Sequence, residues 1–375
     1  MRGMGARVIV VSHGFQQRYE RGFVNALAIN GIQVCLIGSD DTDPGRLLPG
    51  VELINLRGSQ DPRRSLGAKA ANLVRYHLRL IGYVARNRDA VVHTIGLFRF
   101  AILTGIVENF VLSRLSRRLV VTVHDLLPHQ RHGRWNQIVY RRIWRIPDRL
   151  VVHTQRMRAA LIERFAVDPA RIVVMEHGIN DEIAPRAPRP DAIARVARKR
   201  GAPLRLLIFG AVAPSKGVDL LLEAFAGLDE RFELVIAGRC LDRAYAGRIA
   251  ALIASNRNRE RITWRDEFVP EHEVDGYFVA ADVVVLPYRH IDQSGVLLEA
   301  LGQGVPIVAT DVGAFAHYVS AADGVIVRPG DVGALRAGIL RVADDLAAFD
   351  RASIERRARR FLWSETVKSL LDVYA

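Results

Sequence analysis

Short apolar runs alternate with longer amphipathic stretches along the whole chain. The runs in the first half are rich in Val, Ile and Leu, and they predict buried strands at 7–11, 33–37, 90–93, 119–123, 150–153 and 171–175. Phe23, Leu27 and Ile29 mark the apolar side of a helix after the first strand, and residues 57–88 predict a long helix with several arginines. This alternation is typical of βαβ units around a parallel sheet.

The same alternation restarts after a segment rich in proline. Residues 184–203 hold four prolines and many arginines, which predicts a linker between two domains. After it, we expect strands at 204–209, 232–237, 262–264, 282–286 and 306–310. Residues 218–225 have a 3.6-residue period, and 345–374 predict a final helix. We therefore predict domains at 1–185 and 186–350.

A turn-rich segment and a short apolar helix follow the predicted strand at 282–286. Asp292 and Ser294 are its candidate N-caps, and Gly304 followed by Pro306 marks its end. A loop that leads into a helix offers free backbone N–H groups to an anion. Glu299 is the one acid among apolar neighbours, so its carboxylate needs a partner. A ribose diol and a buried arginine are both candidates.

Polar residues also follow other predicted strands, at the edge where open α/β sheets bind ligands. Lys216 and Arg239 each follow a strand of the second half, and their charges suit a diphosphate. For Arg239, a surface salt bridge is the alternative. His124 follows the strand at 119–123, and Gly14 follows the first strand. A structural histidine and an ordinary βα turn are the alternatives for these two.

The charge of the chain is unevenly distributed. The 375 residues carry a net charge of +13; residues 1–185 hold 27 Lys and Arg against 15 Asp and Glu, whereas the remainder holds 26 against 25. The basic half indicates an anionic partner, such as a membrane surface, a nucleic acid or a phosphorylated acceptor. Two cysteines suggest neither a disulfide framework nor a metal set. We expect a cytoplasmic protein, because the first apolar run is too short for a signal peptide.

The stretch 286–306 resembles the donor-binding signature of the family-four retaining glycosyltransferases, which have the GT-B fold. Glu299, Ala300, Gly304 and Pro306 match its second half. Its first glutamate would fall on Ile291, and Gln293-Ser294-Gly295-Val296-Leu297 instead resembles a variant subgroup that lacks this acid. The resemblance implies an α/β fold with two Rossmann-like domains facing each other across a cleft. It also implies that a C-terminal helix, 351–375, crosses back to the first domain.

The resemblance assigns roles to individual residues. The expected donor-binding residues are Gly14, Lys216, Arg239, Val269, Ser294, Gly295, Val296 and Glu299, and the expected catalytic residues are His124, Lys216 and Arg239. His13, Phe15 and His129 are expected on the acceptor side. The family's arginine before the Lys-Gly pair is replaced by Ala211, and we expect Arg239 to compensate. No Asp-x-Asp segment looks like a metal–diphosphate clamp, so we expect neither a metal nor a cofactor.

The predicted reaction is a metal-independent, retaining transfer of a sugar from a nucleotide-diphosphate sugar to a glycan or polyprenyl-linked acceptor, in bacterial cell-surface or exopolysaccharide assembly. A nucleotide-sugar 2-epimerase of the same fold and a basic nucleic-acid-binding protein are the alternatives. We expect no nucleic-acid partner, because no pattern of stacking aromatics accompanies the charge, and a dehydrogenase would need a Gly-rich fingerprint that is lacking. Arginines and aromatics at 131–145 predict a helix on an anionic inner leaflet, its aromatics either at headgroup level or in the core.

Overall fold

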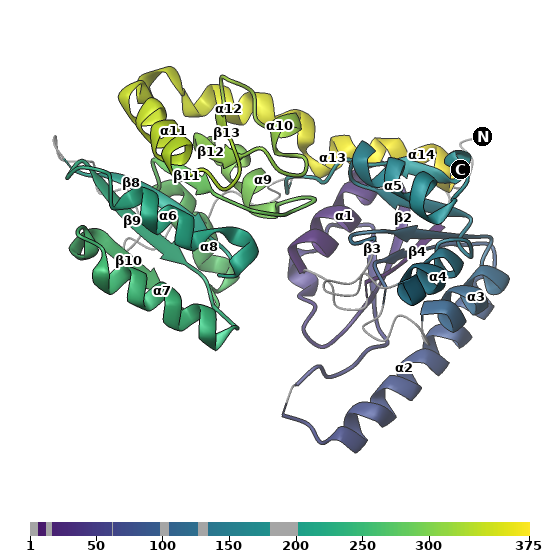
Figure 1. Ribbon diagram of the computed structural model, residues 1–375. Helices are drawn as coiled ribbons and strands as arrows, with labels where there is room; N and C mark the ends of the chain where they lie inside the picture. Colours follow the sequence, from purple (N-terminus) through teal and green to yellow (C-terminus); the bar gives the residue numbers. More distant parts are fainter. Residues whose placement is uncertain (1–6, 13–16, 62, 98–104, 127–133, 181–201) are drawn as a thin grey trace. The chain divides into compact units, whose positions relative to one another are not determined.

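The protein divides into two compact α/β units. The computed structural model describes residues 7–12, 17–61, 63–97, 105–126, 134–180 and 202–375. Unit 1 comprises Met1–Asp181 and Phe361–Ala375, and unit 2 comprises Glu182–Arg360. Each unit has one parallel sheet with helices packed against it (Figure 1). The predicted fold class, α/β with two Rossmann-like domains, is confirmed.

The sheet of unit 1 has seven strands in the order β3-β2-β1-β4-β5-β6-β7. They are β1 (Arg7–Val11), β2 (Gln33–Gly38), β3 (Val51–Asn55), β4 (Val91–Ile95), β5 (Arg118–Thr122), β6 (Arg149–Val152) and β7 (Ile172–Val174). All neighbouring strands are parallel, so their carboxyl ends share one edge. The sequence did not predict β3, because this edge strand is only partly buried and has no continuous apolar run.

Helices cover both faces of this sheet. They are α1 (Gln17–Ile29), α2 (Leu66–Arg86), α3 (Ile106–Leu115), α4 (Arg134–Ile143) and α5 (Gln155–Phe165). Alternate residues of β1 enter two separate apolar clusters, with Ile9 and Val11 in one and Val8 and Val10 in the other. The long helix predicted within residues 57–88 is α2, and Ser65 caps its start by accepting a hydrogen bond from the Ala68 N–H at 3.2 Å.

The aromatic residues of the α4 region separate into two groups. Tyr140 and Trp144 are buried in the core of unit 1 beside Ile143, whereas Trp135 is exposed. The expectation of aromatics at headgroup level is therefore wrong for Tyr140 and Trp144, because they lie one helical turn apart on the face that packs on the sheet. Among the described residues, no helix combines the length and the apolar character needed to cross a bilayer.

The sheet of unit 2 has six strands in the order β10-β9-β8-β11-β12-β13, again all parallel. They are β8 (Leu204–Phe209), β9 (Phe232–Ala237), β10 (Ile262–Arg265), β11 (Val283–Leu286), β12 (Ile307–Thr310) and β13 (Gly324–Val327). The helices are α6 (Val218–Phe225), α7 (Arg243–Ser255), α8 (Glu271–Ala280), α9 (Gly295–Gly302), α10 (Phe315–Tyr318) and α11 (Val332–Asp344). The bounds of β8, α6 and β9 are those predicted from the sequence.

The C-terminal stretch is a series of short helices. The single helix predicted over 345–374 is wrong; α12 (Arg351–Ala358), α13 (Trp363–Thr366) and α14 (Leu371–Tyr374) take its place. The chain extends between α12 and α13 because Ile179 donates to the Phe361 carbonyl at 2.6 Å and accepts from the Trp363 N–H at 2.9 Å. Beyond this point, Trp363 and Tyr374 are buried in the core of unit 1.

Candidate functional site

Lys216 lies on the turn that follows β8 at the carboxyl edge of unit 2. The next residue, Gly217, has a left-handed φ of +65°, and a Cβ there would lie 2.0 Å from the Pro287 carbonyl oxygen. Only glycine permits this approach, because any larger residue would collide with backbone. The turn therefore lies directly against the chain that leaves β11, next to Tyr288.

The amine of Lys216 rests on the face of the Tyr288 ring, with Nζ 3.9 Å from the ring centroid. Tyr288 is fully buried and packs against Phe315, with ring centroids 5.4 Å apart. The negative face of the ring attracts the ammonium group and holds it in one place. Burial lowers the pKa of Lys216 to about 8. The site thus presents a fixed cation whose charge is lost at mildly alkaline pH.

A buried carboxylate in α6 holds this turn in place. Arg289 donates to both oxygens of Asp219, at 2.8 and 3.0 Å, and to the Pro214 carbonyl at 2.7 Å. The Tyr245 hydroxyl donates to the same carboxylate at 2.9 Å. Burial alone would raise the pKa of Asp219, but the hydrogen bonds from Arg289 and Tyr245 lower it below its usual value. Asp219 is therefore an ionised anchor for the Lys216 turn.

Arg239 lies on the neighbouring loop, after β9. The Val212 N–H donates to the Arg239 carbonyl at 3.0 Å, so the loop that carries Ala211 and the loop that carries Arg239 are joined through backbone. A Cβ on Gly238 would lie 1.9 Å from the Gly210 carbonyl oxygen, which again requires glycine. The Arg239 guanidinium is exposed and forms no ion pair with the residues that the structure describes. It is thus placed beside the position at which Ala211 stands.

The start of α9 completes this edge. Of the two candidate N-caps, Ser294 is the one used, and its Oγ accepts from the Leu297 N–H at 3.4 Å. The N–H groups of Gly295 and Val296 have no acceptor within the helix, as in any first turn. A Cβ on Gly210 would lie 3.4 Å from Val296, so the loop after β8 approaches the first turn of α9.

Glu299 lies in the next turn of α9 and is half-buried. Its Oε1 accepts a hydrogen bond from Gln303 Nε2 at 3.3 Å. Ile291, at the position of the absent first glutamate, is held through its backbone: its carbonyl oxygen would lie 2.2 Å from a Cβ on Gly313, whose φ is +57°. Glu299, the carboxylate predicted to bind the ribose, is therefore on a regular helix. Ile291, at the position of the absent glutamate, is on a turn that the contact with Gly313 fixes.

Val269, one of the expected donor-binding residues, lies on the loop after β10. Val269 is 7% exposed, whereas its neighbour Phe268 is 77% exposed. Arg265 anchors the loop by donating to the Tyr277 hydroxyl at 2.8 Å and by binding the carboxylates of Glu267 and Glu273. Phe268 is consequently the large apolar side chain that this loop exposes.

In unit 1, four histidines lie on the adjacent strands β4 to β7 or shortly after them: one lies inside β4, and the other three follow β5, β6 and β7. They are His93, His124, His153 and His177, and we call them the histidine row. Burial is the main cause that lowers their pKa values, to about 3 for His93 and His177, to about 4 for His153, and well below the usual value for His124. All four rings are therefore neutral near pH 7, when each can donate one hydrogen bond and accept another.

Buried partners fix the members of the row. His93 bonds Tyr374 at 2.6 Å and Thr122 at 2.7 Å, and His153 bonds Tyr19 at 3.2 Å. The Tyr19 ring also meets His124 edge-on, with centroids 4.9 Å apart. His124, the member predicted as catalytic, is half-buried, whereas His93 and His153 are buried. His124 is therefore a neutral, oriented imidazole at the carboxyl edge of unit 1.

The structure places some predicted residues and leaves others outside its range. Lys216, Arg239, Ser294, Gly295, Val296 and Glu299 lie on one edge of unit 2, and His124 lies in unit 1. His13, Gly14, Phe15 and His129 lie outside the described residues. Sequence reasoning missed Tyr288 and the other three histidines, although each of these histidines ends or follows an apolar run of the sequence, a recurrence that could have revealed the row. Within the described ranges, no group of three or more His, Cys, Asp or Glu side chains could hold a metal ion.

Comparison with known proteins places both halves of the chain among glycosyltransferases. A family model described as glycosyl transferases group 1 matches residues 203–345, and one described as glycosyltransferase family 4 matches residues 16–183. Two curated relatives are named D-inositol 3-phosphate glycosyltransferase: one from Thermobispora bispora is 31% identical over 249 residues, and one from Xylanimonas cellulosilytica is 35% identical over 243 residues. These matches cover 61% of this chain but 56% and 57% of the relatives, so the chain spans little more than half of their length.

Solved structures share the fold over almost the whole chain. Sucrose-phosphate synthase from Thermosynechococcus elongatus has a TM-score of 0.75 and 21% identity, and the match covers 99% of this chain and 98% of that one. Anabaena Alr3699/HepE in complex with UDP has a TM-score of 0.72 and 16% identity, with the same coverage. Because the family matches extend over both halves and the fold is shared throughout, the protein belongs to the family-four-like glycosyltransferases with the GT-B fold.

Proposed function

We propose that the protein transfers a sugar from a nucleotide-diphosphate sugar to an acceptor hydroxyl, with retention of the anomeric configuration. One observation carries the proposal: Lys216, fixed on Tyr288, lies on the same sheet edge as the first turn of α9 and Glu299. A cation and free amide groups suit a diphosphate, and a carboxylate suits a ribose diol. Structures of Anabaena Alr3699/HepE are described as complexes with UDP and with UDP-glucose, which supports a nucleotide-sugar donor.

In the proposed reaction, the acceptor hydroxyl attacks the anomeric carbon from the side on which the diphosphate leaves. The bond from that carbon to the diphosphate oxygen breaks while the bond to the acceptor oxygen forms. A phosphate oxygen of the leaving group takes the hydroxyl proton, so no protein base is needed. We propose that Lys216, Arg239 and the amides of α9 stabilise the leaving diphosphate without a metal. His124, as a neutral imidazole, would orient the transferred sugar by a hydrogen bond.

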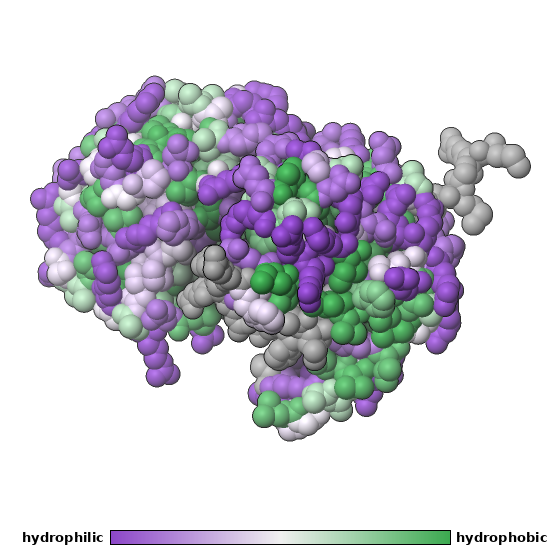
Figure 2. Space-filling model, turned by 45° about the vertical axis from the view of Figure 1, so that its right-hand side comes forward, coloured by the Kyte–Doolittle hydropathy of each residue, from purple (hydrophilic) through white to green (hydrophobic). Residues whose placement is uncertain are grey.

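We further propose that the acceptor is a glycan or a lipid-linked saccharide of the bacterial cell surface, glycosylated at the cytoplasmic face of the membrane. Unit 1 carries the basic excess and an exposed apolar face on three neighbouring helices, α2, α3 and α4. We call this the apolar face; its exposed side chains are Leu66, Val74, Leu78, Val107, Phe110, Trp135 and Ile138. Figure 2 shows hydrophobic residues gathered on the side of unit 1. Apolar residues among arginines suit an anionic bilayer surface.

A thermal-shift screen with common nucleoside diphosphates and their sugars tests the donor site. A ligand present at one hundred times its Kd stabilises a protein by about 2.7 kcal/mol, which raises the melting temperature measurably. Lys216→Met should keep the fold and lose most of the shift. If no nucleotide shifts the wild-type protein, the proposal fails. With a donor in hand, NMR of the product reports the anomeric configuration, and an epimerised sugar nucleotide formed without acceptor would identify a 2-epimerase instead.

A further inference from the structure

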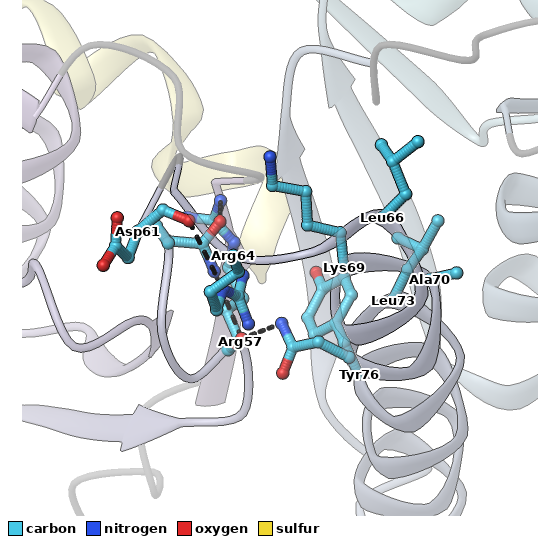
Figure 3. Close-up of a pocket in the computed structure, with 10 residues that line it drawn as sticks. Arg57, Asp61, Arg64, Leu66, Lys69, Ala70, Leu73 and Tyr76 are labelled. Atoms are coloured by element: carbon cyan, nitrogen blue, oxygen red, sulfur yellow. Dashed lines mark hydrogen bonds between the residues drawn. The ribbon is translucent and has the colours of Figure 1, made fainter.

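A pocket of about 480 Å³ opens in unit 1 between the start of α2 and the loop that joins β3 to α2. Arg57 and Arg64 line it from the loop, and Lys69 lines it from the first turn of the helix. Figure 3 shows the two arginines on one side of the pocket, with Leu66 and Leu73 on the other and Lys69 between them. The pocket thus joins a cationic wall to an apolar wall.

Among the described residues, the two arginines of this pocket make only long hydrogen bonds with their side chains. Arg57 Nη2 donates to Gln60 Oε1 at 3.3 Å, and Arg64 Nε donates to the Asp61 carbonyl at 3.4 Å. Both bonds are long and go to neutral acceptors. The one lining carboxylate, that of Asp61, is bound by two nitrogens of Arg63 at 3.1 Å, and Arg63 does not line the pocket. The hydrogen bonds from Arg63, together with the charges of Arg64 and Lys69, lower the pKa of Asp61. Three cations thus line the pocket against one carboxylate, and the lining has a net positive charge.

The pocket belongs to the same sheet edge as the histidine row. The Arg57 N–H donates to the Gly38 carbonyl at the end of β2, at 3.1 Å. Beyond the end of β1, the Ser12 hydroxyl donates a hydrogen bond to the buried carboxyl of Glu20. Burial raises the pKa of Glu20, and the hydrogen bond from Ser12 and the charge of Arg57 partly oppose this rise. Arg57 thus lies within electrostatic range of the end of β1. In a parallel α/β sheet this edge is where ligands bind.

The chemistry of the walls indicates the ligand. Three cations suit a phosphate group, whose charge near pH 7 is about −1 to −2, and arginine binds phosphate through two parallel hydrogen bonds. The amino end of α2 adds a favourable dipole at the same place. The apolar side continues along α2 through exposed Val74 and Leu78, so a hydrocarbon next to the phosphate would also find a surface.

We propose that this pocket binds a phosphate group of the acceptor, which makes the acceptor of the reaction proposed above a phosphorylated molecule. That the bound molecule is an acceptor rests on the proposed transferase function, but the pocket itself lies entirely within unit 1. Two sources offer the same chemistry. One is a soluble sugar or polyol phosphate, and the other is the phosphate headgroup of a polyprenyl-linked saccharide.

Isothermal titration of the full chain tests the pocket. With the donor site filled by saturating UDP, one arm titrates myo-inositol 3-phosphate, and the other titrates detergent micelles doped with a polyprenyl phosphate against undoped micelles. We expect one arm to show binding that Arg64→Gln and Lys69→Gln each weaken by about tenfold or more, the loss expected for a charged hydrogen bond. Arg75→Gln, an exposed cation of α2 outside the pocket, should bind as the wild type does.

The outcomes separate the pocket from the donor site. Binding in neither arm, or equal binding by Arg64→Gln, Lys69→Gln and the wild type, overturns the pocket. UDP affinity should be the same in all four proteins, since none of these residues lies in unit 2. If UDP fails to bind at all, the proposed transferase function fails. The same titrations without UDP still test the pocket, because they compare phosphate binding by the wild type with binding by Arg64→Gln and Lys69→Gln.

Discussion

Lys216 determines how donor binding should depend on pH. Its pKa of about 8 means that most molecules carry the charge at pH 7 and few carry it at pH 9. We predict that UDP affinity falls about tenfold between these values, because only the ammonium form attracts the diphosphate. Isothermal titration in a buffer series measures this. Lys216→Arg remains charged throughout and should lose little affinity over the same range.

The stability of the ligand-free protein should respond to the same lysine with the opposite sign. The folded pKa of about 8 lies below the ordinary value of 10.5, so the unfolded chain binds more protons between these two pH values. Stability therefore rises with pH across this window, and Lys216→Met should not show that rise. A UDP affinity that stays constant from pH 7 to 9 in the wild type would contradict the charge role of Lys216.

Glu299 gives a second prediction at the scale of one residue. If its carboxylate accepts hydrogen bonds from the ribose, Glu299→Gln should weaken UDP binding by roughly 1–3 kcal/mol without lowering the melting temperature. Glu223→Gln, an exposed acid on α6, is the matched control. The sharper test uses 2′-deoxy-UDP. The mutant and the wild type should bind this analogue with more similar affinities than UDP, and an undiminished difference would assign Glu299 a structural role.

Residues of this edge differ in how far the sequence reveals them. The turn at Lys216 could be predicted, and the cap of α9 could be narrowed to Asp292 or Ser294, because local spacing indicates a helix start and a Lys-Gly turn. Tyr288 under Lys216 could not, and neither could the Asp219–Arg289 pair, because these partners lie about 70 residues apart and meet only through the order of the strands. The role of Arg239 likewise depends on the contact between two loops.

At the scale of elements, the histidine row makes unit 1 sensitive to acid. Below pH 6.5 the unfolded chain protonates these residues, whereas the folded unit keeps His153 neutral to about pH 4 and His93 and His177 to about pH 3. The unfolded state then binds more protons, so stability falls as the pH drops through this window. We predict a loss on the order of 1–2 kcal/mol for each of these histidines at pH 5.

Urea unfolding at pH 7 and pH 5 measures this loss. His153→Gln should lower stability at pH 7, where its hydrogen bonds are broken, yet lose less between pH 7 and pH 5 than the wild type does. His272→Gln, an exposed histidine of unit 2, should follow the wild type at both pH values. Equal urea midpoints of the wild type at pH 7 and pH 5 would mean that the pKa values of the histidine row are not lowered by folding.

Central strands are the elements that the sequence predicts best. β8 and β9 are apolar except for one charged residue each, Arg205 and Glu233, and turn residues stand at both ends, so burial and local pattern agree. β3 and the C-terminal stretch were missed or wrong for different reasons. β3 is an edge strand that is only partly buried, so it has no continuous apolar run. The C-terminal stretch bends where it pairs with Ile179, far away along the chain, and no local period reports such a partner.

For the whole molecule, the uneven charge and the apolar face predict binding to anionic membranes. The protein should sediment with vesicles that contain phosphatidylglycerol more than with phosphatidylcholine vesicles, since each basic residue near the surface contributes about 1 kcal/mol. High salt should weaken this binding. Leu78→Ser together with Trp135→Ser should reduce it, whereas Leu241→Ser, an equally exposed leucine of unit 2, should not. Equal partitioning to both lipids, or to neither, would exclude the membrane proposal.

The burial of Trp363 and Tyr374 in unit 1 has a consequence for the order in which the protein can be made. A ribosome completes the sheet of unit 1 early, but the side chains that fill one face of its core emerge only after all of unit 2 has been synthesised. Unit 2 can therefore finish folding first, although its residues come later than most of unit 1. Until residue 374 leaves the exit tunnel, the nascent first unit keeps an uncovered apolar surface and is the part that a chaperone would have to protect.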